Sequence, residues 1–117
     1  MKYLSNAVAE IVDSKLHICG GQVRAKSQST CHVLLGTSWE VQNSLSVARG
    51  LAAGSMTEDG WLVTGGYKDA GRISPVGTTH SSSDLYTGGV WTSGPTLPTP
   101  TMEHCQVTVG SKVIVAG

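Results

Sequence analysis

The stretch W-L-V-T-G-G, residues 61–66, runs four residues of strand-forming type directly into two glycines. A similar stretch, L-H-I-C-G-G, occupies residues 16–21, and V-I-V-A-G occupies residues 113–117. The first glycines of the three stretches stand 45 and then 52 residues apart. Self-similarity at a period of this length is typical of repeat architectures. The longer offset also relates Val33 to Leu85, Trp39 to Trp91 and Leu45 to Leu97.

Each repeat unit is predicted to contain four short β-strands. A strand of small and apolar residues comes first, and the second strand ends in glycine. A polar loop leads to the third strand, and a glycine turn leads to the fourth, which contains tryptophan. Four antiparallel strands in about 50 residues indicate an all-β protein and are typical of a β-propeller blade. The expected strands are 6–12, 16–19, 30–34 and 39–41, then 50–56, 61–64, 83–86 and 90–93, then 104–109 and 113–116.

The charge and hydropathy of the sequence argue against nucleic acid and membranes as partners. The 117-residue chain has eight Lys or Arg residues against eight Asp or Glu, and no basic run. This pattern favours neither nucleic acid nor an anionic membrane surface as a partner. No apolar run reaches the roughly 18 residues of a membrane-spanning helix, and the N-terminal residues lack the apolar core of a signal peptide.

The repeat resembles the kelch family of β-propellers. Two places depart from the family pattern: Leu34 stands where a tyrosine is usual, and Thr101-Met102-Glu103 stand where an arginine is expected. The resemblance implies kelch-type blades in units 6–49 and 50–101, with the start of a third at 102–117. The residues that carry it are Gly20, Gly21, Trp39, Leu45 and Arg49, then Gly65, Gly66, Tyr86, Trp91, Leu97 and Pro98.

Kelch rings close with about five to seven blades, which is more than two units and part of a third. We therefore expect an incomplete ring and a chain that is a fragment of a longer protein. The alternatives are a truncated product and a chain that closes a ring by oligomerising. Open blade edges would also allow self-association.

The glycine pairs and the tryptophans are assigned structural roles, as is Arg49. Glycine lets the backbone leave a strand with positive φ in a crowded centre, and lets the indole of a neighbouring blade lie over it. The glycines concerned are Gly20, Gly21, Gly65 and Gly66. Trp39 and Trp91 are expected to fill the space between adjacent blades.

The loops between the second and third strands are the candidate recognition site. Long loops on a rigid scaffold are where binding usually resides, and the second of these loops is seven residues longer than the first. The leading hypothesis is a non-catalytic module that presents these loops to a protein partner, as kelch scaffolds commonly do. The residues predicted to contact the partner are Arg24, Lys26, Tyr67, Lys68, Asp69, Arg72 and His80.

The alternative hypothesis is a fragment of a propeller enzyme, because some kelch relatives are copper oxidases or sugar-processing enzymes. The copper chemistry needs two tyrosines and two histidines at one face, and no convincing set can be assembled here. His104 and Cys105 are adjacent in an expected strand and point to opposite faces, so they cannot form a nucleophile–base pair. No motif for a metal or cofactor is present, and we predict neither.

The three cysteines leave the compartment open. Cys19 ends one expected strand and Cys31 lies at the start of its antiparallel neighbour, so the two could come close enough for a disulfide. Invertebrate kelch chains with a C-G-G…C pattern are similar, which implies an extracellular setting. The missing signal peptide and the unpaired Cys105 instead favour buried, reduced thiols in the cytoplasm.

Overall fold

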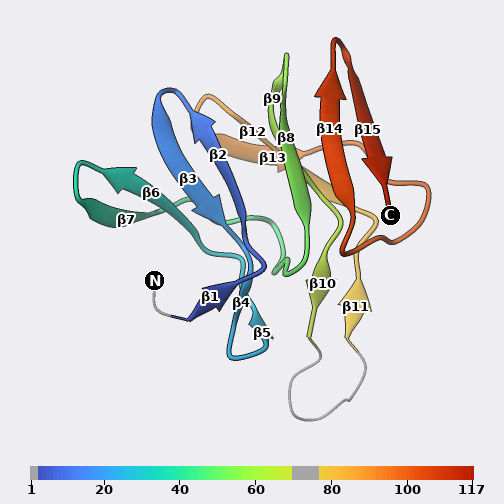
Figure 1. The fold of residues 1–117 in the computed structure, drawn as a ribbon, viewed down its shortest axis with the longest axis horizontal. Helices are drawn as coiled ribbons and strands as arrows, with labels where there is room; N and C mark the ends of the chain where they lie inside the picture. Colours follow the sequence, from blue (N-terminus) through green and yellow to red (C-terminus); the bar gives the residue numbers. More distant parts are fainter. Residues whose placement is uncertain (1–2, 70–76) are drawn as a thin grey trace.

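The computed structural model describes residues 3–69 and 77–117, and within these ranges the protein is all-β (Figure 1). The described residues form fifteen strands and no helix. Accordingly, no helix in the described ranges is long and apolar enough to cross a membrane.

Two four-stranded antiparallel sheets follow one another along the chain, and each is a simple meander. A two-stranded hairpin follows them, and we call these units the first blade, the second blade and the third hairpin. The first blade comprises β2 (Val8–Val12), β3 (Lys15–Cys19), β6 (Cys31–Leu35) and β7 (Ser38–Gln42). The second comprises β8 (Ala53–Thr57), β9 (Gly60–Thr64), β12 (Ser83–Thr87) and β13 (Val90–Ser93), and the third hairpin β14 (Cys105–Val109) and β15 (Lys112–Ala116).

The chain enters each unit through the same turn. Asn6, Leu51 and Glu103 all have positive φ, at 55°, 59° and 54°, and they are separated by the two repeat offsets. The Glu103 amide donates to the Leu51 carbonyl, and the Leu51 amide donates to the Asn6 carbonyl. Successive units are therefore linked by backbone hydrogen bonds. This turn also explains why β2 and β8 begin two or three residues later than the sequence predicts.

The loops between second and third strands contain strands of their own, which the sequence analysis had not predicted. The first loop forms β4 (Gln22–Val23) and β5 (Lys26–Ser27), and the second forms β10 (Tyr67–Lys68) and β11 (Thr78–Thr79). β1 (Leu4–Ser5) pairs with β4. The seven extra residues of the second loop fall between β10 and β11, a stretch that includes residues 70–76, outside the described ranges.

The paired glycines have the predicted positive φ, but a different neighbour. A Cβ on Gly20 would collide with the carbonyl oxygen of Arg49, and one on Gly65 would collide with that of Thr101. The chain leading from one unit to the next therefore presses on these glycines. The predicted indole of a neighbouring blade does not lie over these glycines, because that backbone already occupies the space.

The core lies between the first and second blades. Val8, Val12 and Cys19 of the first blade cluster with Trp61 and Val63 of the second, and Trp61 is 0% exposed. The first strands of neighbouring units lie side by side, since β8 contacts both β2 and β14 (Figure 1). This arrangement is that of consecutive propeller blades.

The two repeat tryptophans have different environments. Trp91 packs against Tyr86 and Trp61, and its indole N–H donates to the Asn43 carbonyl of the preceding unit. It fills the space between blades as predicted. Trp39 does not, because it is 37% exposed. The fourth-strand tryptophan faces the preceding unit, and no described blade precedes the first.

Candidate functional site

The β4–β5 hairpin begins the candidate site. Its turn consists of Arg24 and Ala25, both with positive φ, as is usual in two-residue hairpin loops. β1 pairs with the other edge of β4, so that Leu4 lies opposite Val23. Arg24 is therefore held exposed at the tip of a three-stranded sheet, although each strand has only two residues.

The β10–β11 hairpin is anchored to the scaffold through Tyr67. The Gly50 and Tyr67 backbones exchange two hydrogen bonds, at 2.9 and 2.7 Å. The Tyr67 ring lies so close over Gly77 that a Cβ there would overlap it. Tyr67 is half-buried, so its ring supports the hairpin and is only partly available to a partner.

A reciprocal contact joins the two hairpins, which we call the paired hairpins. The Ser27 amide donates to Asp69 Oδ1 at 2.6 Å, and the Asp69 amide donates to Ser27 Oγ at 3.2 Å. β5 and β10 are consequently in contact, and the four short strands gather at one end of the molecule (Figure 1). Asp69 was predicted as a site residue but Ser27 was not, since a serine in a polar loop gives no signal of its partner.

Three exposed cations project from the paired hairpins. These are Arg24, Lys26 and Lys68. The Arg24 guanidinium lies 5.6 Å from the centre of the Tyr3 ring, a cation–π distance. Neither lysine forms an ion pair with a described carboxylate. Arg72, the fourth predicted cation, lies outside the described ranges.

His80 occupies a different setting from these cations. Its ring is half-buried, and its Nε2 lies 3.0 Å from the Ala48 carbonyl oxygen. Burial lowers the pKa of His80, while the hydrogen bond to Ala48 opposes that shift. A ring held this way ties the loop to the preceding unit, so the structure groups His80 with the scaffold.

A buried ion pair locks the first blade to the second. Arg49 Nε lies 3.1 Å from Asp84 Oδ2, with the two side chains 0% and 3% exposed. Arg49 Nη1 donates to the carbonyls of Gly65 and Ser82, and Nη2 donates to Ser82 Oγ. Arg49 was predicted as a structural residue, whereas Asp84 was missed. An acid inside a strand is ordinarily read as solvent-facing.

The second unit replaces this arginine with a different contact. Thr101 occupies the place of Arg49, because its carbonyl accepts from Gly66 as the Arg49 carbonyl accepts from Gly21. The Thr64 hydroxyl donates to Gln106 Oε1, so His104 Nε2, 2.8 Å away, is the donor to that hydroxyl. Burial lowers the pKa of His104, which favours the neutral ring over the imidazolium.

Cys19 and Cys31 are joined by a disulfide, with Cα atoms 4.1 Å apart. They lie directly opposite one another in the register of β3 and β6. Cys105 is a free and exposed cysteine. Among the described residues, no three His, Cys, Asp or Glu side chains come together in a group that could hold a metal ion.

Comparison with known proteins identifies a similar fold but no family. The sequence matches no protein-family model. No curated protein matches it either. A solved structure of similar fold is that of YjhT, with a TM-score of 0.78 and 13% sequence identity. The match covers 97% of this chain and 41% of YjhT, so the chain spans about two-fifths of that protein. At this identity the likeness shows the fold alone: all-β, built of blade-like four-stranded sheets.

Proposed function

We propose that this chain is part of a kelch-type propeller and acts as a non-catalytic scaffold that binds a protein partner through the paired hairpins. The supporting observation is the reciprocal contact between Ser27 and Asp69, which makes two loops from different repeat units into one surface. A preorganised surface loses less conformational entropy on binding than two independent loops would. Loops on a rigid scaffold are also where recognition residues usually lie.

The charge of this surface favours an acidic partner segment. Arg24, Lys26 and Lys68 are exposed, and the carboxylate of Asp69 accepts a hydrogen bond from the Ser27 amide. Arginine is enriched at protein interfaces, and charge complementarity raises association rates and selects among partners. A peptide or surface strand rich in Asp and Glu would meet these cations directly.

Selection from a random peptide display library tests the proposal. We expect acidic peptides to be enriched on the immobilised chain. Their affinity should fall at least tenfold in the Arg24→Ala/Lys68→Ala variant and weaken with added salt. The matched control is Lys15→Ala/Lys112→Ala, which removes two exposed cations from other strands. Peptides that bind both variants equally, or that show no acidic preference, would exclude the paired hairpins as the site.

A further inference from the structure

A pocket of about 160 Å³ lies between the first and second blades, beside the turn that joins β2 to β3. Asp13, Lys15 and His17 line it from that turn and from β3. Tyr86 of β12 and Gly89 of the β12–β13 turn line it from the second blade. The β2–β3 turn and the paired hairpins lie at opposite ends of the first blade, so this pocket is separate from the surface proposed above (Figure 1).

Both charged side chains at this pocket lack a partner. Asp13 and Lys15 are exposed, and neither side chain forms an ion pair or a hydrogen bond with any residue in the described ranges. Burial lowers the pKa of His17, while the Val12 backbone and the Asp13 charge oppose this shift and the Lys15 charge adds to it. Both charges therefore act on the same ring. Opposite charges border one small volume without forming a pair with each other.

Two polar side chains of the pocket are buried and have hydrogen-bonding capacity to spare. His17 is 7% exposed and Tyr86 is 8% exposed, with their rings 5.5 Å apart. The Tyr86 hydroxyl has no hydrogen-bond partner among residues 3–69 and 77–117. The lowered pKa keeps the His17 ring neutral at pH 7, so one ring nitrogen carries a proton and the other can accept a hydrogen bond. Buried polar groups are ordinarily hydrogen-bonded, so these two favour a polar ligand.

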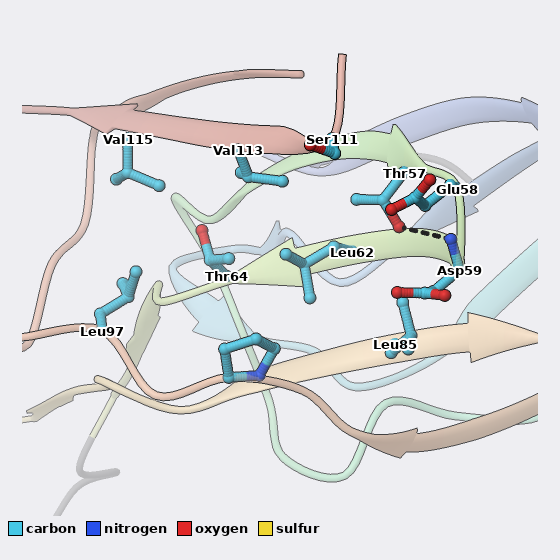
Figure 2. Close-up of a pocket in the computed structure, with 11 residues that line it drawn as sticks. Thr57, Glu58, Asp59, Leu62, Thr64, Leu85, Leu97, Ser111, Val113 and Val115 are labelled. Carbon is cyan, nitrogen blue, oxygen red and sulfur yellow. Dashed lines mark hydrogen bonds between the residues drawn. The ribbon is translucent and has the colours of Figure 1, made fainter. Parts of the chain in front are cut away.

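The second blade shows that the fold does not require these polar side chains. A larger pocket, of about 320 Å³, lies between the second blade and the third hairpin (Figure 2). It is mainly apolar, and Leu62 and Leu85 line it in that view. By the repeat offsets, Gly60, Leu62 and Gly94 stand in the places of Lys15, His17 and Gln42. The polar lining of the smaller pocket is thus particular to the first blade, as expected of a binding site placed on a common scaffold.

We propose that the smaller pocket binds a small zwitterion, an α-amino acid with a short apolar side chain. Lys15 binds the carboxylate of this ligand, Asp13 binds its ammonium group, and Val33 packs against its side chain. With a neutral His17, the charges at the pocket sum to zero. A ligand with one charge alone would leave either Asp13 or Lys15 without a counter-ion, whereas a zwitterion meets both.

The volume of the pocket sets the size of the ligand. A cavity of about 150 Å³ can hold benzene, and L-alanine has as many non-hydrogen atoms as benzene. The amide of Gln42, on β7, and the Tyr86 hydroxyl are then left to donate to the ligand carboxylate. A large side chain such as that of L-tryptophan would not fit.

An NMR titration of the 117-residue chain with L-alanine tests this inference. We expect saturable shift changes at Lys15, His17 and Gly89, with a Kd of about 1 mM or lower. Propionate lacks the ammonium group and ethylamine lacks the carboxylate, so each should bind at least tenfold more weakly. The absence of a saturable shift would overturn the inference, as would equal binding of propionate or ethylamine. Shifts confined to the paired hairpins would overturn it too.

The repeat supplies a matched pair of double variants. Asp13→Asn/Lys15→Gln removes both charges from the pocket, and asparagine tolerates the positive φ of 50° at residue 13. Glu58→Gln/Lys112→Gln removes exposed charges at the equivalent places, one unit and two units further along the chain. We expect the first variant to reduce affinity for L-alanine at least tenfold and the second to change it less than threefold. Unchanged affinity in the first variant, or an equal loss in both, would contradict the inference.

Discussion

Two interfaces join successive units of this protein: the closed seam, between the first and second blades, and the open seam, between the second blade and the third hairpin. Equivalent backbone positions form both, but aromatic side chains fill only the closed seam. Between the first and second blades, Trp61, Tyr86 and Trp91 cover the face that includes His17 and Val33. Between the second blade and the third hairpin, Val113 stands in the place of Trp61, no described residue stands in the place of Tyr86 or Trp91, and a pocket remains. The backbone repeat thus positions the faces, and the aromatic third and fourth strands close them.

The two blades also differ in the bonds formed at equivalent positions of their second and third strands. The disulfide pair of the first blade, Cys19 and Cys31, corresponds to Thr64 and Ser83 in the second, which lie opposite one another in the same register. Thr64 donates to Gln106 of the third hairpin, and Ser83 donates to the Pro95 carbonyl. The first blade is cross-linked internally, while the second uses these positions for hydrogen bonds to neighbouring segments.

Breaking the ion pair of the closed seam should have the largest effect. We expect Arg49→Met to lower the free energy of unfolding by about 3–5 kcal/mol, because Asp84 stays buried without its cation. Chemical denaturation measures the change. Thr101→Met, at the equivalent place in the open seam, should cost less than about 1 kcal/mol. Equal losses at the two positions would refute the distinction between the seams.

Removing the cross-link of the first blade should come next. The disulfide closes a loop with a sequence separation of 12 residues. A cross-link of that span contributes about 3 kcal/mol by the chain-entropy account. The double variant Cys19→Ala/Cys31→Ala should lose about that amount of unfolding free energy, while Cys105→Ala should stay within about 0.5 kcal/mol. Free thiols at Cys19 and Cys31 in the native protein, detected by alkylation and mass spectrometry, would contradict the bridge itself.

The two repeat tryptophans sharpen the comparison further. Trp91→Ala should cost about 2 kcal/mol, because it removes a ring packed on Tyr86 and Trp61 and the hydrogen bond to Asn43. Trp39→Ala should cost less than about 1 kcal/mol, because Trp39 is 37% exposed. Melting temperatures of the two variants rank the two losses of stability. A larger loss for Trp39→Ala would contradict the assignment of Trp91, and not Trp39, to the interface between the blades.

Acid should weaken both seams by a smaller amount. Burial lowers the pKa of His17 and of His104 from the ordinary value of 6.5. The backbone hydrogen bonds to Val12 and Thr64 and the charge of Asp13 oppose the shift, and Lys15 adds to it. The folded state therefore holds fewer protons than the unfolded state once the pH falls below about 6.5. Stability is highest above that pH, and we expect the melting temperature to fall by about 2–5 °C between pH 7.5 and 5.5. A melting temperature that rises on acidification would contradict the neutral, buried state of these rings.

The strand order of the repeat could be predicted from the sequence better than the side-chain contacts that hold the units together. Strand order, both offsets and the glycine pairs follow from local patterns such as W-L-V-T-G-G, which are visible without tertiary context. Asp84 could not be found this way, because only the packing of one unit on the next shows that it meets Arg49. The strands β4 and β10 were missed because two residues are too short to show a period. The exposure of Trp39 could not be predicted either, because burial of its side chain depends on a neighbouring unit and not on the local sequence.

Amide hydrogen exchange tests the contrast between a closed and an open seam most directly. β9 has strand partners on both edges, whereas its repeat equivalent β15 has a described partner on one edge only. We predict slow exchange along the whole of β9, Gly60–Thr64, and an alternating pattern along β15, Lys112–Ala116, in which amides that point away from β14 exchange rapidly. Uniform protection along β15 in the isolated chain, or equally fast exchange in β9, would contradict this account.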